Sequence, residues 1–166
     1  TEVIEMQKIF EDAEELKNEL TEIRRTIHQC PEAGPALPHT KEFVMKKLKE
    51  FGYEPEEICE SGITATIEGD KPGKTILLRA DMDALAIKEE APVPFASTNN
   101  FMHACGHDMH TTMLLGAARL LKKYQKDIAG KVKLVFQPDE EGFTGAKTML
   151  KAGVLENPKV DAGMAL

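Results

Sequence analysis

The chain has 166 residues, and its 21 Lys and Arg against 28 Asp and Glu give a formal net charge of −7. Apolar residues make up 42% and charged residues 30%, which is an ordinary composition for one globular domain with its own core. This composition excludes disordered, collagen-like and disulfide-scaffold proteins; the acidic balance argues against nucleic acid as a partner, and no apolar run approaches the roughly 18 residues of a membrane span.

The first part of the chain predicts two helices. Apolar residues spaced by three or four positions from Ile9 to Ile27 indicate one long amphipathic helix, which ends at Cys30-Pro31 because a residue before proline leaves the α region. A helix of this length is more often docked on a sheet than paired in a coiled coil. A second helix is expected over about residues 40–51, with Gly52 at its end. Its inward positions are Phe43, Val44, Leu48 and Phe51.

Extended segments follow the second helix. Residues 63–67 alternate with period two, residues 70–73 have turn chemistry, and residues 75–78 form a short apolar run typical of a buried strand. The stretch from Glu89 to His110 is interpreted as a loop, and a loop of that length is uncommon unless it is functional. A helix over about residues 111–124 comes next. Its apolar stripe consists of Met113, Ala117, Leu120, Leu121 and Tyr124.

The remaining chain alternates strand and helix. Residues 131–137 predict a strand, residues 145–151 a short helix, and residues 160–166 another apolar strand. The residues that share one face of the first of these strands are Val132, Leu134 and Phe136. Strands that alternate with helices at this spacing predict an α/β fold, a sheet with helices on its faces. Because no cap, turn or polar tail follows the last strand, we expect the chain to stop inside a longer domain.

The cysteines and the N-terminus favour a cytoplasmic protein. Cys30, Cys59 and Cys105 are too few and too scattered for a disulfide framework. The acidic, amphipathic start has neither the basic nor the apolar region of a secretory signal. We therefore expect a reducing compartment.

Residues of the types that bind metal ions are concentrated in the loop before the third predicted helix. Three of the five histidines, His103, His107 and His110, fall within eight residues. In an extended segment Cys105 and His107 share a face, so a thiolate and an imidazole converge on one ion, and Gly106 lets the backbone pass close to it. The following helix N-terminus favours the thiolate form. A set of satisfied polar loop residues is the alternative, but packing alone does not explain so many such ligands in one loop.

Two acidic pairs follow predicted strands. Asp81 and Asp83 come directly after the strand that ends near Ala80, where open α/β sheets bind ligands, so one is expected to bind metal and the other to orient a ligand imidazole. A solvated strand end is at least as good an explanation of that pair alone. Glu140 and Glu141 follow the later strand, and two adjacent glutamates suit two roles, one as metal ligand and one as general base. An ordinary solvated face is the alternative for this pair.

Four segments together resemble a known family. The segments are Arg24–Glu32, Leu78–Leu85, Met102–Asp108 and Phe136–Gly142. They are similar to metal-dependent amidohydrolases and carboxypeptidases, the family of hippurate hydrolase, N-acyl-L-amino-acid amidohydrolase and the auxin-conjugate hydrolases. The resemblance implies a mixed sheet flanked by helices, of the zinc-exopeptidase type. It also implies that residues 1–166 are the N-terminal segment of the catalytic domain, without the dimerisation domain and the C-terminal catalytic segment.

The resemblance also implies a site and a reaction. Cys105, His107 and Glu141 are the expected ligands of two divalent metal ions, which would be zinc, manganese or cobalt. Glu140 is the expected general base and Asp83 an orienting residue beside the metals, whereas Asp81 and His110 lie in matching motifs without an assigned role and His103 is expected to be structural. The implied reaction hydrolyses the amide bond of hippurate-like N-acyl amino acids or short peptides, in a homodimer.

Two further ligand histidines of the family would follow Leu166, one immediately and one near the family's C-terminus. We therefore expect the isolated chain to bind metal weakly and to be inactive.

Two other functions stay open at this point. A cysteine-nucleophile hydrolase would use Cys105 with His107, although a nucleophile and a base rarely meet when they come from one short segment. A non-catalytic metal-binding or interaction domain would use the glutamate-rich first helix as its partner surface. A chelator should inactivate a metal enzyme but not a cysteine-nucleophile hydrolase. Glu140→Gln should abolish turnover in the complete metal enzyme and have no effect in a non-catalytic binding domain.

Overall fold

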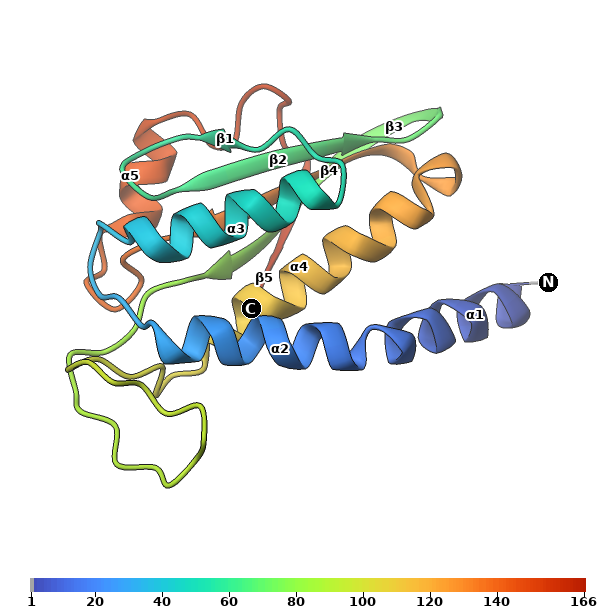
Figure 1. Cartoon of the computed structure of the whole chain (residues 1–166). Helices are drawn as coiled ribbons and strands as arrows, with labels where there is room; N and C mark the ends of the chain where they lie inside the picture. The colour runs from blue at the N-terminus through green and yellow to red at the C-terminus, as the bar shows by residue number, and fades with distance from the viewer. Residues whose placement is uncertain (1) are drawn as a thin grey trace.

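A five-stranded mixed sheet organises the chain in the computed structural model, which describes residues 2–166 and the side chains of residues 6–166 (Figure 1). The strands are β1 (Glu56–Glu57), β2 (Ile63–Glu68), β3 (Lys71–Asp81), β4 (Ala129–Gln137) and β5 (Ala162–Ala165). Their order in the sheet is β1-β2-β4-β3-β5. Strand β3 runs parallel to β4 and β5, whereas β2 is antiparallel to β1 and β4. The predicted α/β fold with a mixed sheet is confirmed.

Helices cover both faces of this sheet (Figure 1). They are α1 (Glu2–Glu15), α2 (Lys17–Gln29), α3 (Pro38–Glu50), α4 (His107–Lys123), the short 3₁₀ helix η1 (Gln125–Asp127) and α5 (Gly145–Lys151). Helices α3 and α4 lie on one face, α2 packs on α4, and α5 lies on the opposite face. None of the described helices has the length and apolar character needed to cross a bilayer.

The predicted single N-terminal helix is two helices that meet at Leu16. Ile23 and Ile27, in the second of them, are buried in the main core, whereas Ile9 in the first is 41% exposed. Figure 1 shows α1 extending away from the sheet, where it has less surface to pack against. The main contact of α2 is with α4, and its residues Ile23 and Ile27 belong to the core that the sheet also lines.

The segment between β2 and β3 is extended where a turn was predicted. Residues 71–73 belong to β3, and only residues 69–70 separate the two strands. Both strands pair with β4, so this segment crosses the start of β4. A Cβ at Gly69 would lie 2.0 Å from the Ile128 carbonyl oxygen, and one at Gly130, whose φ is +93°, would lie 2.1 Å from the Lys74 carbonyl oxygen. Glycine is required at this crossing because the two backbones touch.

Helix α4 begins at His107, four residues before the predicted start, and its buried face differs from the predicted stripe. Leu114, Leu115 and Ala118 are buried, whereas Met113 is 49% exposed. The helix lies between α2 and the sheet, so it is buried on two sides. A single apolar stripe along the sequence therefore does not predict its buried residues.

The other predicted elements are close to the observed ones. Val132, Leu134 and Phe136 of β4 face the main core together, as expected, and α5 has the predicted bounds. Helix α3 starts two residues early, at Pro38, and Gly52 ends it with a φ of +85°. Val44, Leu48 and Phe51 are buried as predicted, and Phe43 is partly buried. The last strand is an exposed edge strand rather than a buried one.

Candidate metal centre

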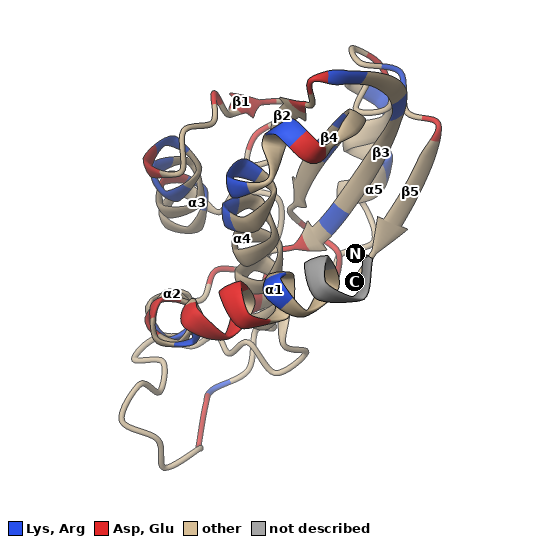
Figure 2. Ribbon diagram, turned by 90° about the vertical axis from the view of Figure 1, so that its right-hand side faces the viewer, with Lys and Arg blue, Asp and Glu red and all other residues tan. Residues whose placement is uncertain are grey.

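Two parallel strands and one helix bring the candidate residues together. Strands β3 and β4 are in register at their carboxyl ends, where Asp81 pairs with Gln137. The loop after β4 carries Glu140 and Glu141, and α4 begins at His107 close to the same edge. Figure 2 shows acidic residues, coloured red, where β3 ends. Segments far apart in the sequence therefore meet beyond the strand ends, where α/β sheets bind ligands.

His107 is the centre of this arrangement. Its imidazole is buried, and Nδ1 lies 2.8 Å from the backbone oxygen of Asp83. A carbonyl oxygen only accepts, so Nδ1 donates the hydrogen and Nε2 keeps its lone pair in the neutral ring. The oxygens that face Nε2 belong to Asp81 at 3.6 Å, Glu140 at 3.8 Å and Glu141 at 3.9 Å.

The negative charges around His107 affect the pKa of its imidazole. Burial alone would lower the pKa of His107, but hydrogen bonding to Asp83 and the negative charges of Asp81 and Asp83 outweigh it and raise the pKa above its ordinary value. A positive charge at this position is therefore favourable, whether a proton or a metal ion supplies it.

Asp83 positions the glutamate pair. Its fully buried carboxylate accepts the backbone N–H of Glu140 at Oδ1 and that of Glu141 at Oδ2, both at 3.0 Å. Burial raises the pKa of Asp83, but hydrogen bonds from His107 and these two amides outweigh it and lower the pKa below its usual value. The backbone carbonyl of Asp83 lies 2.8 Å from Nδ1 of His107 and its carboxylate Oδ1 lies 3.5 Å from the same nitrogen, so Asp83 contacts the imidazole as well as the loop that carries the glutamates.

Asp81 is fixed by two partners. Its Oδ1 lies 2.7 Å from Nδ1 of His110, one turn along α4 from His107, and its Oδ2 accepts a hydrogen bond of 2.8 Å from Arg79. The same guanidinium donates to Gln137 and to the backbone oxygen of Leu166. Arg79 thus connects the ends of β3 and β4 with residues beyond β5, a contact that the sequence analysis did not identify.

Cys105 lies in a turn rather than in the extended segment that was expected. Gly106 caps α4 with a φ of +83°, a left-handed conformation that favours glycine. The thiol is exposed, and hydrogen bonding to Glu141, followed by burial, raises its pKa to about 11. The predicted effect of the helix N-terminus on the thiolate is therefore outweighed by the carboxylates beside it.

The described side chains fit a divalent cation. Two groups have ligand atoms that all lie within 4.8 Å of one another: Asp81 with His107 and His110, and His107 with Glu140 and Glu141. Imidazole and carboxylate are ligands for zinc, manganese and cobalt. The Oε1 atom of Glu141 is buried without a hydrogen-bond partner among the described residues, and a buried carboxylate oxygen requires a partner or a cation.

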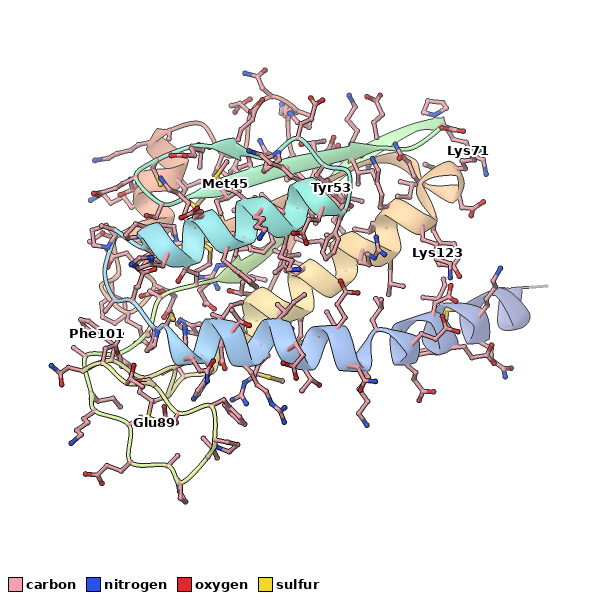
Figure 3. All side chains as sticks on the ribbon, viewed as in Figure 1. Met45, Tyr53, Lys71, Glu89, Phe101 and Lys123 are labelled. Atoms are coloured by element: carbon pink, nitrogen blue, oxygen red, sulfur yellow. The ribbon has the colours of Figure 1, made fainter. Side chains whose placement is uncertain are left out.

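A second polar cluster adjoins this centre through Asp108, the residue after His107 in α4. The sequence analysis missed it. The Asp108 carboxylate accepts hydrogen bonds of 2.6 Å from Arg24 and 2.8 Å from Nδ1 of His28. Nε2 of His28 lies 3.0 Å from Glu89, in the loop between β3 and α4 (Figure 3). Each ring nitrogen of His28 therefore faces a carboxylate oxygen at hydrogen-bond distance. We call Arg24, His28, Glu89 and Asp108 the compensated cluster, because each of its carboxylates faces a basic side chain.

His103 lies next to the compensated cluster without joining it. Its ring is centred 6.2 Å from that of His28, and neither of its nitrogens has a hydrogen-bond partner among the described residues. Burial lowers the pKa of His103 to about 4, so the ring is neutral at pH 7.

Comparisons with known proteins show which family the chain resembles. A family model described as peptidase family M20/M25/M40 matches residues 77–166, more than half of the chain. Thermostable carboxypeptidase 2 of Saccharolobus solfataricus is 44% identical over 155 residues, which cover 90% of this chain and 39% of that protein. Hippurate hydrolase of Campylobacter jejuni is 46% identical, over 86% of this chain and 37% of its own. The chain thus spans about two fifths of the length of these relatives.

A solved structure gives the same result. The YXEP protein of Bacillus subtilis, described as a dinuclear metal binding peptidase from the M20 family, superposes with a TM-score of 0.87 at 37% identity. The match covers 92% of this chain and 43% of that one.

Proposed function

Because the chain belongs to the peptidase family M20/M25/M40, we propose that it forms the metal-binding part of a hydrolase for the amide bond of hippurate-like N-acyl amino acids or short peptides. One observation carries the proposal: Asp83 holds the backbone of Glu140 and Glu141, and both carboxylates face Nε2 of His107, at 3.8 and 3.9 Å. A glutamate pair beside an available imidazole supplies one group to bind a metal ion and one to move a proton.

Two divalent metal ions are the proposed cofactors, with Cys105, His107 and Glu141 among their ligands. A thiolate ligand favours zinc or cobalt, whereas the carboxylates also accept manganese. Bound there, such ions supply Lewis-acid polarisation of the amide carbonyl and make water a stronger acid. The hydrogen bond from Nδ1 of His107 to the Asp83 carbonyl keeps Nε2 available as a ligand atom.

Glu140 is the proposed general base. Its side chain is 38% exposed, so the carboxylate is open to a substrate, while Asp83 holds its backbone in place. The carboxylate takes a proton from the attacking water and then delivers it to the nitrogen of the leaving amino acid. A cysteine-nucleophile mechanism is disfavoured, because the pKa of Cys105 is raised to about 11 and its neighbour Glu141 stabilises the thiol rather than the thiolate.

The isolated 166-residue chain is proposed to be inactive and to bind metal weakly, since it spans only 37–39% of the length of the relatives named above. The homodimer and the cytoplasmic location stay predictions. Turnover by the purified chain alone would contradict the first of these statements.

The decisive test is Glu140→Gln in the metal-loaded, full-length protein. We expect kcat for N-acyl amino acids to fall by about 100- to 10,000-fold, the usual contribution of a general base, while cobalt(II) stays bound. The matched control is Glu54→Gln, because Glu54 is exposed and lies between α3 and β1, outside the segments that carry the candidate residues. Unchanged turnover in the Glu140 variant would exclude the proposed mechanism and favour a non-catalytic metal-binding domain.

Cobalt(II) titration tests the ligand assignment separately. The wild-type protein should show a thiolate-to-metal charge-transfer band in the near ultraviolet, and Cys105→Ser should lose it. Cys30→Ser is the control, because Cys30 is also exposed but does not lie in the loop that leads into α4. A band that survives in Cys105→Ser would remove Cys105 from the ligand set.

A further inference from the structure

Arg79 brings a positive charge to the edge of the candidate metal centre. Its side chain is 17% exposed, and its Nη1 lies 2.8 Å from Oδ2 of Asp81, an oxygen that itself lies 3.6 Å from Nε2 of His107. For metal binding this charge is a disadvantage, because a guanidinium so close to the centre repels a cation. Any favourable effect of Arg79 on metal binding must therefore come from its hydrogen bonds.

The guanidinium connects the ends of three neighbouring strands. Its Nε donates to Oε1 of Gln137 at the end of β4, at 3.0 Å. Its Nη1 donates both to Asp81, at the end of β3, and to the backbone oxygen of Leu166, after β5, at 2.7 Å. The amide of Leu166 in turn donates to the Arg79 carbonyl at 3.2 Å. Arg79 thus holds Leu166 with its backbone and its side chain, through the same nitrogen that holds Asp81.

This contact gives each oxygen of the Asp81 carboxylate a partner. Oδ1 lies 2.7 Å from Nδ1 of His110, whose ring stacks on that of His107 with the centroids 5.5 Å apart. The last torsion of an aspartate side chain is soft, so one hydrogen bond alone leaves the carboxylate free to turn. Arg79 supplies the second hydrogen bond, which fixes the plane of the carboxylate next to both imidazoles.

We propose, on the basis of the proposed metal binding, that Arg79 is a positioning residue of the metal centre, which fixes Asp81 beside His107 and His110 and joins the end of β5 to them. A centre held in one arrangement does not have to be ordered when cations bind, so the hydrogen bonds of Arg79 raise the affinity for metal. Its charge acts in the opposite direction, and the hydrogen bonds have the larger effect.

The cobalt(II) affinity of the full-length protein, measured by competition with a chelator, separates the two effects. Arg79→Lys keeps the charge but loses the planar fork of donors, and Arg79→Met loses both. We expect both variants to bind cobalt(II) about 10- to 100-fold more weakly than the wild type, the usual result when a partner of a metal ligand shell is removed. If charge decided instead, Arg79→Met would bind more tightly and Arg79→Lys would equal the wild type.

Two further variants control this comparison. Arg119→Lys should leave the affinity unchanged, because Arg119 is an exposed arginine of α4 whose guanidinium packs on the ring of Phe51. Gln137→Leu keeps Arg79 but removes one of its partners, so it should weaken cobalt(II) binding in the same direction, even if the Arg79 variants do not fold. Urea unfolding of the metal-free proteins shows which variants fold.

The outcomes distinguish this proposal from the proposed function. A wild-type protein that binds no divalent cation contradicts the proposed function. Wild-type affinity in folded Arg79→Lys, or in Gln137→Leu if the Arg79 variants do not fold, overturns the positioning role, and a lower free energy of unfolding alone would then mean that Arg79 only fastens the strands. Tighter binding by Arg79→Met also overturns it, because charge would then be the larger effect.

Discussion

His107 and Asp108 are neighbours at the start of α4, yet they belong to two polar clusters of opposite character. Asp108 joins the compensated cluster, in which Arg24 and His28 face the carboxylates of Asp108 and Glu89 at hydrogen-bond distances. His107 faces the candidate metal centre, where four carboxylates, those of Asp81, Asp83, Glu140 and Glu141, meet one guanidinium, that of Arg79. Two adjacent residues of α4 therefore face paired polar groups in one case and an excess of negative charge in the other.

The difference in charge indicates a different role for each cluster. Buried charges are costly unless paired, so the paired side chains of this cluster fasten α2, α4 and the long loop together, although Oδ1 of Asp108 has no hydrogen-bond partner among the described residues. An excess of negative charge is unfavourable in the metal-free protein. It becomes favourable when a divalent cation enters. Charge balance thus distinguishes the compensated cluster from the candidate metal centre on a single helix.

Breaking the compensated cluster should have the largest effect on stability. Asp108→Ala leaves Arg24 and His28 without their shared anion, and we expect the free energy of unfolding to fall by about 3–5 kcal/mol. Urea unfolding measures it.

The control for this variant is an exposed pair. Glu50→Ala breaks the Lys47–Glu50 contact of 2.8 Å on the surface of α3, and should leave the free energy of unfolding close to that of the wild type, because solvent screens an exposed ion pair. If Asp108→Ala changed stability as little as Glu50→Ala, the cluster would have no structural role.

His103 should give the cluster region a pH dependence. Its pKa is about 4 in the folded protein and about 6.5 when unfolded, so the unfolded chain binds the proton first as pH falls. Its contribution to stability is complete above pH 6.5 and is lost between pH 6.5 and 4, by up to about 3 kcal/mol. Unfolding free energies at several pH values, compared between wild type and His103→Phe, isolate this contribution. Parallel curves for the two proteins would contradict it.

Much of the fold follows from local pattern. The alternation of Val132, Leu134 and Phe136 fixes the inward face of β4, and Gly52 marks the end of α3. The meeting of the two acidic pairs was also predictable, because parallel strands end at the same edge of a sheet.

Contacts between distant segments could not be predicted in the same way. His28 lies 80 residues before Asp108 and 61 before Glu89, and no local pattern links a histidine on one helix to a glutamate in a remote loop. The helical start at His107 was missed because it depends on Gly106 in a left-handed conformation, which is set by the surrounding chain rather than by the apolar stripe of α4.

A glutamate-to-glutamine substitution in each cluster compares the two directly, with small expected changes in stability. Glu141→Gln removes one charge from the negative excess, so in the presence of chelator the variant should be equal to wild type or more stable by up to about 1 kcal/mol. Glu89→Gln removes a balanced charge, and should destabilise by about 1–3 kcal/mol because His28 loses an anionic partner.

Adding metal should reverse the order of stability of the two variants. Cobalt(II) stabilises the wild type in proportion to its affinity, and Glu141→Gln should lose more than about 10-fold of that affinity while Glu89→Gln keeps it. Thermal unfolding with and without cobalt(II) measures both effects on one pair of proteins. If Glu141→Gln destabilised the metal-free protein as much as Glu89→Gln does, the carboxylates around His107 would serve the fold, and charge balance would not distinguish the two clusters.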